Sequence, residues 1–300
     1  MTPDMEVEIA GVKWKNPVTV ASGTFGSGME YGEFIDLNRL GAITSKGVAI
    51  EPWEGNGTPR VAETPSGMLN AIGLQNPGME VFRNRDIPFM KKYDTVVVVN
   101  VVGKSTEEYI QAVEALGDTD VDMLEINISC PNVKEGGIAF GTDKNVAAAL
   151  TKEIKAHAKQ PVIMKLSPNV TSITEMAKAV EDAGADAISL INTVTGMKID
   201  VERQSIFLAN KTGGLSGPAI RPIAVRMVYE ASHSVKIPVI GMGGITGAED
   251  ALEFILAGAT AVSVGTASFN NPYTAIEVID GIRDYMVRKN INSIKDIIGI

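Results

Sequence analysis

The chain has 300 residues, 45% of them hydrophobic, and carries a formal net charge of −9 at pH 7. This composition supports a large buried core, whereas an acidic chain lacks the basic surface that attracts nucleic acids and anionic membranes. Its single cysteine, Cys130, excludes an internal disulfide, an iron–sulfur cluster and a cysteine zinc site within one chain, and no metal site is expected.

The amino-terminal segment lacks the basic and apolar regions of a signal peptide. No apolar run in the chain reaches the roughly 18 residues that a membrane span needs. Together with the low cysteine content, these features predict a cytoplasmic protein that does not contact a membrane. Within the same segment, EVEIAGVKWKNP predicts a small hairpin.

Eight short apolar or β-branched runs follow, and amphipathic runs lie between most of them. We expect strands at residues 18–21, 42–46, 95–101, 123–128, 162–166, 187–191, 238–241 and 261–265. Helices are expected at residues 105–117 and 172–184, where the first helix opens with a Ser-x-x-Glu capping box, and at 247–259. This alternation favours an α/β fold, a (β/α)8 TIM barrel with residues 1–300 as one domain. A doubly wound open sheet is the alternative.

Three connections are too long for simple turns: residues 47–94, 130–143 and 192–217. Each follows a strand, so in a barrel all three lie on the carboxyl-terminal face, where active sites form. The amino-terminal hairpin is expected to close the opposite end.

Polar residues stand at strand ends in otherwise apolar runs, namely Lys46, Asn100, Asn127 and Lys165. Because lysine is almost never fully buried unless it is paired, the two lysines suggest anions in the barrel mouth. The alternatives are structural hydrogen bonds for the asparagines and extension to solvent for the lysines. Cys130 comes just after a strand, and a thiol with an ordinary pKa of about 8.5 needs only modest tuning to act as a general base. Its alternative role is that of a small buried hydrophobe.

Glycines follow the last two barrel strands, in PVIGMGGITG and AVSVGTA. Gly243, Gly244 and Gly265 allow backbone amides to approach a phosphate, and these two loops form the recurrent phosphate site of this fold. The segment GMGGITG also resembles a dinucleotide fingerprint, but it lacks the acidic residue that such a motif requires.

The chain resembles the dihydroorotate dehydrogenase family over essentially its whole length. The matching segments are NPVTVASGTFG, ITSKGV, NAIGLQNPG, VVVVNVVG, EINISCPNVKEGG, VIMKLSPN, INTVTGMKID, GGLSGPAIRP, PVIGMGGI and VGTA. TVASGTFGSGMEY, NAIGLQNPG and CPNVKEGGIAFGTD are similar to class 1B, the NAD-linked type with a partner subunit. The membrane-bound class, by contrast, uses a serine base and carries an amino-terminal extension.

The resemblance implies FMN as the cofactor of this chain. Its phosphate would contact Gly217, Gly243, Gly244, Gly265 and Thr266. The flavin and ribityl chain would be lined by Ser22, Lys46, Gly47, Asn100, Asn127, Lys165 and Ile191. Lys165 would then place a fixed positive charge near the ring system, which stabilises the anionic reduced flavin.

The resemblance further implies that the chain oxidises (S)-dihydroorotate to orotate in pyrimidine biosynthesis. The amides of Asn70, Asn127 and Asn192 and the hydroxyl of Thr193 would bind the ring, and Lys46 would bind the carboxylate. Backbone groups of the segment after Asn70 would surround that carboxylate, and they belong to Ala71, Ile72, Gly73 and Leu74. Cys130 would remove a proton from the carbon beside the carbonyl while hydride leaves the neighbouring carbon.

Electrons would then pass to a partner subunit that holds FAD and a 2Fe–2S cluster and reduces NAD, with a homodimer of this chain at the core of a heterotetramer. Three alternatives remain from the sequence. One is a homodimeric enzyme that reduces fumarate, the second is a flavin-free aldolase or isomerase barrel that binds phosphate, and the third is a flavin-binding subunit without activity.

Overall fold

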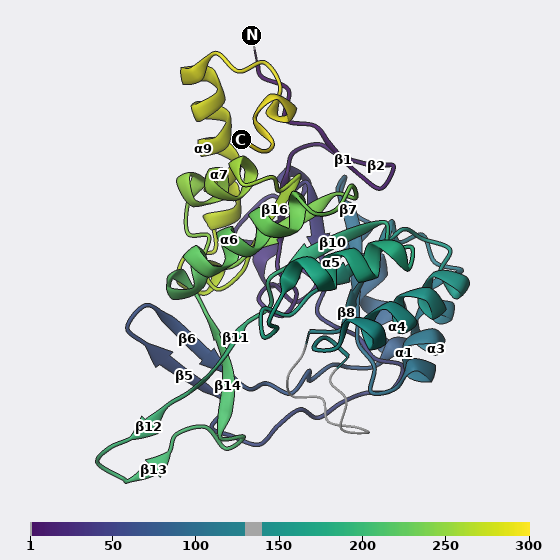
Figure 1. Cartoon of the computed structure of the whole chain (residues 1–300), viewed down its shortest axis with the longest axis vertical. Coiled ribbons are helices and arrows are strands. Elements are labelled where there is room, and N and C mark those ends of the chain that lie inside the picture. The colour runs from purple at the N-terminus through teal and green to yellow at the C-terminus, as the bar shows by residue number, and fades with distance from the viewer. Residues whose placement is uncertain (1, 130–139) are drawn as a thin grey trace.

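Strands built from continuous apolar runs form a parallel sheet at the centre of the molecule (Figure 1). The computed structural model describes residues 2–129 and 140–300. Its eight-stranded sheet has the order β3-β16-β15-β10-β9-β8-β7-β4. The strands are β3 (Val18–Val20), β4 (Ala42–Thr44), β7 (Val96–Val101), β8 (Met123–Asn127), β9 (Val162–Lys165), β10 (Ala187–Leu190), β15 (Val239–Met242) and β16 (Ala261–Val264). Each lies at an expected strand, with ends that differ by at most two residues, so the sequence interpretation is confirmed.

The two outer strands of this order meet and close the sheet. Gly41 N donates to Val18 O (3.0 Å), and the Thr19 hydroxyl donates to Ala42 O (2.9 Å). A Cβ on Gly41 would lie only 2.0 Å from Asn16 O, so the close approach of the two backbones requires glycine here. The result is the (β/α)8 barrel expected from the sequence rather than an open sheet.

Helices surround the barrel on its outer side (Figure 1). The longer ones are α3 (Thr106–Leu116), α4 (Lys144–His157), α5 (Ile173–Asp182), α6 (Arg221–Ser232), α7 (Ala248–Leu256) and α9 (Thr274–Lys289). The shorter ones are η1 (Tyr31–Glu33), η2 (Leu37–Arg39), α1 (Met79–Val81), the π-helix η3 (Phe82–Asp86), α2 (Ile87–Met90), η4 (Pro218–Ile220), α8 (Ala267–Asn270) and η5 (Ile294–Ile297). Among the described residues, no helix combines the length and apolar character that a membrane crossing requires.

Serine caps begin two of the helices as expected. Ser105 and Ser172 each accept a hydrogen bond from the backbone amide three residues later, at 3.3 Å. The reciprocal bond of the capping box predicted at Ser105 does not form, because the Glu108 carboxylate accepts from Lys104 N (2.9 Å) instead. The Glu108 carboxylate therefore bonds to the backbone amide one residue before Ser105 rather than to that of Ser105 itself.

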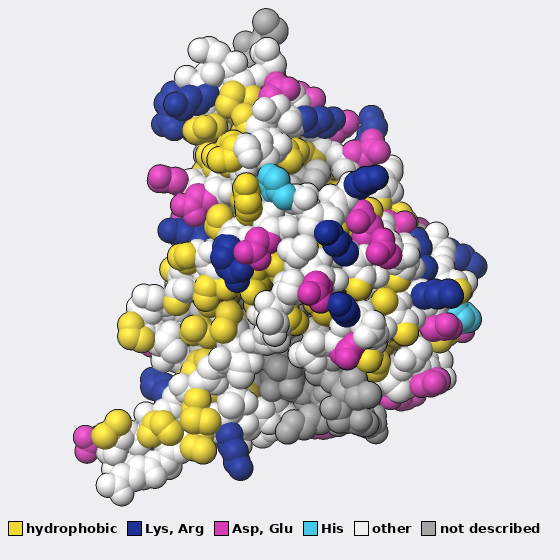
Figure 2. All heavy atoms as spheres, viewed as in Figure 1, with side chains coloured by type: hydrophobic (Ala, Val, Ile, Leu, Met, Phe, Trp, Pro, Cys, Tyr) yellow, Lys and Arg dark blue, Asp and Glu magenta, His cyan; other side chains and the backbone are white. Residues whose placement is uncertain are grey.

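Two of the long connections contain strands that the sequence did not predict. A four-stranded antiparallel sheet has the order β11-β14-β6-β5. Its members are β5 (Val61–Thr64), β6 (Gly67–Asn70), β11 (Val194–Met197) and β14 (Thr212–Ser216). Beyond it, β12 (Ile199–Asp200) and β13 (Ser205–Ile206) form a projecting arm (Figure 1). Figure 2 shows hydrophobic side chains on this arm, where Val201 is 77% exposed.

The amino-terminal hairpin lies at the opposite end of the molecule from this sheet (Figure 1). It consists of β1 (Val7–Ile9) and β2 (Val12–Trp14), paired in antiparallel register. Val7, Ile9 and Trp14 are fully buried in the hydrophobic core, so the alternate side chains of the hairpin cover one end of the barrel.

Candidate active site

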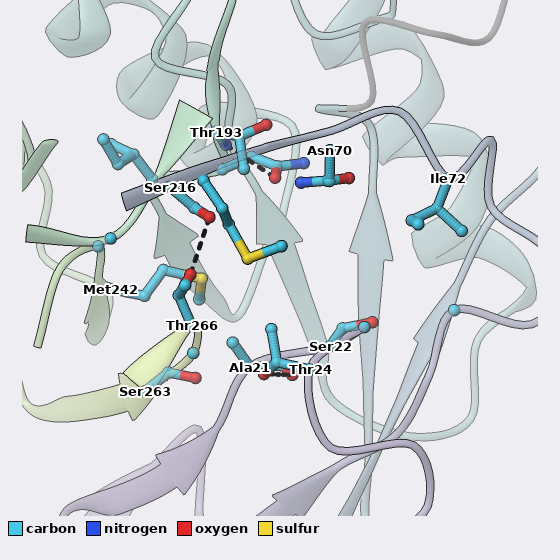
Figure 3. A pocket seen from close by; sticks show the side chains of 18 of the residues that line it. Ala21, Ser22, Thr24, Asn70, Ile72, Thr193, Ser216, Met242, Ser263 and Thr266 are labelled. Carbon is cyan, nitrogen blue, oxygen red and sulfur yellow. Dashed lines mark hydrogen bonds between the residues drawn. The ribbon is translucent and has the colours of Figure 1, made fainter. Parts of the chain in front are cut away.

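A pocket lies at the carboxyl ends of the barrel strands, where the sequence places its candidate residues. Its wall contains Ser22, Lys46, Gly47, Asn70, Ile72, Gly73, Leu74, Asn127, Lys165, Ile191, Asn192, Thr193, Gly217, Gly243, Gly244, Gly265 and Thr266. In Figure 3, Asn70 and Thr193 lie on one side of the pocket, and Ala21, Ser22 and Thr24 lie on the other.

Two of the expected residues lie behind this wall. Asn100 is fully buried, and its side chain bonds to neighbouring barrel residues. Ala71 is also fully buried, and its backbone is held by Arg60 O (2.8 Å) and by the Asn56 side chain (2.9 Å). Both residues therefore shape the pocket through their neighbours rather than by facing it.

Glycine turns at one end of the pocket expose backbone amides. Gly217, Gly243 and Gly244 have φ values of 98°, 131° and 79°, which an L side chain rarely adopts. Within the described part of the chain, the backbone amides of Gly243, Gly244 and Thr266 have no intramolecular acceptor. Such amides, grouped at a loop, form an anion-binding concavity. The Thr266 hydroxyl, which donates to Ser216 Oγ (2.8 Å), adds polar groups beside them (Figure 3).

A buried carboxylate that the sequence interpretation missed lies beneath the pocket. Glu125 on β8 is 3% exposed. One of its oxygens accepts from Asn100 Nδ2 (2.6 Å), and the other accepts from Ser189 Oγ (2.7 Å). Lys165 Nζ lies 3.6 Å from the first oxygen. The Glu125 carboxylate and the Lys165 ammonium therefore form an ion pair inside the barrel.

The register of the barrel explains why these side chains meet. Asn100 is paired with Glu125, and Lys165 is paired with both Asn127 and Ser189. Paired residues of adjacent parallel strands share a face of the sheet, and positions two apart in one strand do as well. Because Asn127 and Lys165 face the pocket, Glu125 points to the same interior. The signal available in the sequence was this spacing of two residues from Asn127 in the apolar run MLEIN.

Hydrogen bonds run from the buried carboxylate up to the pocket wall. Asn127 Nδ2 donates to Asn100 Oδ1 (3.4 Å), and Ser129 Oγ donates to Asn127 Oδ1 (2.8 Å). Asn192 Nδ2 then donates to Ser129 Oγ (2.7 Å). Two of the expected ligand-binding asparagines, Asn127 and Asn192, are therefore joined to Glu125 by one chain of donors and acceptors.

Cys130 and the Gly-containing loop after it lie outside the described residues. Ser129, the residue before Cys130, is 2% exposed and accepts the hydrogen bond from Asn192 in the pocket wall. Its contribution to the site is another feature that the sequence interpretation missed. Among the described residues there is also no group of three or more His, Cys, Asp or Glu side chains that could hold a metal ion.

Comparison with known proteins gives the same family as the sequence motifs. Residues 4–286 match the family model described as dihydroorotate dehydrogenase. A protein of Lachnoclostridium phytofermentans named dihydroorotate dehydrogenase B (NAD(+)), catalytic subunit, is 66% identical over 98% of each chain. A protein of Alkaliphilus metalliredigens with the same name is 58% identical over 99% of this chain and 98% of its own.

A solved structure supports the fold. The crystal structure of DHODH from Eimeria tenella in complex with ferulenol matches with a TM-score of 0.81, covering 99% of this chain and 88% of that chain. The two sequences are 20% identical, so this likeness concerns the barrel architecture alone.

Proposed function

The chain belongs to the dihydroorotate dehydrogenase family, and we propose that it oxidises (S)-dihydroorotate to orotate in pyrimidine biosynthesis as the catalytic subunit of the NAD-linked class 1B enzyme. The observation that carries the proposal is that glycine amides, two lysines and three asparagines line one pocket of a chain from this family. Residues 1–300 act as one catalytic unit in this proposal.

Two features of the pocket suit FMN, namely its exposed backbone amides and the buried ammonium of Lys165. The unsatisfied amides of Gly243, Gly244 and Thr266 suit a phosphate, because aligned N–H groups favour an anion. Glycine is required there, since a Cβ at Gly244 would lie 2.8 Å from Gly217 O. Lys165 provides a buried positive charge in the same wall. FMN bound there supplies the acceptor for the hydride that leaves the substrate.

The chain's own residues bind and orient the substrate. Lys46 pairs with the carboxylate, and the backbone of the segment after Asn70 surrounds it. Asn70, Asn127 and Asn192 match the two amide edges of the ring, because each side chain offers a donor and an acceptor. Thr193 adds a hydroxyl on the same side of the pocket as Asn70 (Figure 3).

Cys130 takes the proton from the ring carbon beside the carbonyl. This assignment rests on the position of Cys130 directly after Ser129, whose hydroxyl is bonded to Asn192. A thiol can act as a general base toward a substrate when its thiolate form is accessible near neutral pH.

The electrons leave through a partner subunit that holds FAD and a 2Fe–2S cluster and reduces NAD. We place a homodimer of this chain within a cytoplasmic heterotetramer. The names of the relatives support a partner, since they describe a catalytic subunit linked to NAD.

The test of this function is an absorbance measurement. The purified chain, loaded with FMN, is mixed with dihydroorotate in the absence of oxygen. We expect the flavin absorbance to fall without any added partner and orotate to form in equal amount. A chain that neither purifies with FMN nor binds it on reconstitution would contradict the proposal and favour a phosphate-binding aldolase or isomerase.

A further inference from the structure

We propose that Glu125 is a positioning residue that holds the active-site asparagines and Lys165 in their working orientation. The inference rests on the function proposed above and extends it to a residue that does not line the pocket. It follows from the buried contacts of Glu125 with three other barrel strands, namely the adjacent β7 and β9 and, beyond β9, β10.

The first argument is the direction of the hydrogen-bond chain. An ionised carboxylate can only accept, so Asn100 must turn its Nδ2 toward Glu125 and its Oδ1 away. That oxygen then faces Asn127 Nδ2, which turns Asn127 Oδ1 toward the Ser129 hydroxyl. Ser129 in turn accepts from Asn192. The carboxylate thereby determines which amide edge each asparagine presents, up to the residues that face the substrate.

The second argument is charge. Lys165 is 3% exposed, and its ammonium faces the Glu125 carboxylate at 3.6 Å. An ammonium at such depth is costly without a counter-charge. Among the described residues of the pocket wall, Lys46 is the only other charged side chain, and it has the same sign. Glu125 is thus the carboxylate that pairs with the Lys165 ammonium and holds it in position.

A purely structural role would not require this residue type. Glu125 stands in the fully buried run MLEIN, whose other members are apolar side chains and Asn127. Apolar side chains of similar volume in place of a buried ion pair are often neutral or stabilising. A carboxylate at this point costs stability, and the orientation of the groups above it is what the carboxylate provides.

The test compares Glu125→Gln with Thr151→Val. Gln accommodates either amide orientation and carries no charge, so it removes both effects with little change in shape. Thr151 is fully buried in α4 and bonds to Ala147 O (2.7 Å), remote from the pocket wall, so its substitution measures a structural loss alone. Both variants are purified with FMN and titrated with orotate by calorimetry. Flavin reduction by dihydroorotate is then followed in a stopped-flow instrument.

We expect Glu125→Gln to retain FMN but to bind orotate about tenfold more weakly, as one misoriented buried amide would cause. The rate of flavin reduction at saturating dihydroorotate should fall by at least about tenfold, because the Lys165 charge is no longer held in place. Thr151→Val should lower the unfolding midpoint and change neither quantity. Orotate affinity and reduction rate in Glu125→Gln equal to those of the unsubstituted chain would overturn the inference.

A second variant keeps the test decisive if the glutamine variant fails to fold. Glu125→Asp retains the charge but is one methylene shorter, so it should bind orotate more weakly than the unsubstituted chain while flavin reduction suffers less. Equal orotate affinity in this variant would also overturn the inference. Failure of the proposed function is recognised separately, because then dihydroorotate would not reduce the flavin of the unsubstituted chain.

Discussion

The ammonium of Lys165 lies 3.6 Å from the carboxylate of Glu125, and the barrel encloses both side chains almost completely. Such a pair is a poor source of stability, because removing two charges from water costs about as much as their attraction returns. Breaking the pair from one side is far more damaging, since the remaining charge is left buried alone.

Lys165→Met should therefore lower the free energy of unfolding by about 3–5 kcal/mol, the usual cost of stranding a buried charge. The double variant Lys165→Met, Glu125→Gln should recover much of that loss, because no uncompensated charge remains. Urea unfolding of the flavin-free chains gives both values. Neither variant should regain the normal rate of flavin reduction, so stability and activity separate. A double variant no more stable than Lys165→Met would show that the pair is not coupled.

Gly244→Ala should abolish tight FMN binding. Its φ of 79° disfavours any side chain, and the new methyl group would lie 2.8 Å from both Gly217 O and Arg221 Cβ. The turn must open, which moves the amides that suit the phosphate. We expect a colourless preparation with an FMN dissociation constant raised at least about tenfold.

Gly247→Ala is the matched control in the same loop. Its φ is −166°, and a Cβ there would meet no atom within 4 Å. This variant should purify with a full complement of flavin, as measured by the ratio of absorbance at flavin and protein wavelengths. Equal flavin content in both variants would place the phosphate elsewhere.

The sequence was sufficient for the barrel because its strands are continuous runs of apolar and β-branched residues, as in VVVVNV. It was insufficient for the antiparallel sheet beside the pocket. Strands β6 (GMLN) and β14 (TGGLS) contain glycines that lower strand propensity. They also pair across 144 positions of the chain, as between Asn70 and Gly214, and local patterns carry no information on such pairing.

Most of the pocket was also predictable, since polar side chains at the ends of parallel strands must meet at one face. How deeply a side chain lies behind the pocket wall was not predictable from the sequence. Asn100 precedes the last residue of β7 and lies behind the wall, although its sequence context resembles that of Asn127. Glu125 was missed because its spacing of two residues from Asn127 becomes meaningful only when the buried partners of its carboxylate are known.

Stability should depend on pH through Asp250, which packs beside the glycine turn. Burial raises the pKa of Asp250, but hydrogen bonds from Thr246 and the adjacent Arg221 guanidinium outweigh it and hold the pKa below its ordinary value of 3.8. A lowered carboxyl pKa adds stability above the ordinary pKa, and this stability is lost as the pH falls through the folded-state value.

Asp250→Asn should thus be less stable than the unsubstituted chain by about 1–3 kcal/mol at pH 7, as expected for lost hydrogen bonds to a charged group. The difference should shrink as the pH falls below 3.8, because protonated aspartic acid then resembles asparagine. Urea unfolding at several pH values measures it. A difference that is constant down to the most acidic pH would mean that Asp250 does not titrate in this range.

Cys130→Ala should leave FMN binding nearly intact but slow flavin reduction by dihydroorotate by at least about a hundredfold, the low end for the loss of a general base. Cys130→Ser should retain some activity only at higher pH, because a hydroxyl is a far weaker acid than a thiol. Stopped-flow reduction across a pH series separates the two. Near-normal reduction by the alanine variant at neutral pH would identify another group as the base.

The chain alone should reduce its flavin with dihydroorotate yet fail to reduce NAD at a useful rate. Its one glycine-rich segment of dinucleotide type, GMGGITG, follows β15 and contributes Gly243 and Gly244 to the pocket wall, where the proposed function assigns them to the FMN phosphate. It also lacks the acidic residue that binds a ribose.

Hydride transfer to NAD needs direct contact of two rings, whereas single electrons cross between cofactors without it. With one cysteine, this chain cannot ligate an iron–sulfur cluster, so the cluster of the proposed enzyme would be held by the partner chain.

Steady-state assays test this expectation by measuring how fast the isolated chain reduces NAD or fumarate with dihydroorotate. NADH should form only after a second chain that carries FAD and iron is added, and the two chains should elute together in size-exclusion chromatography. Rapid NADH formation by the isolated chain would refute the partner model. Efficient fumarate reduction would instead assign the chain to the homodimeric type.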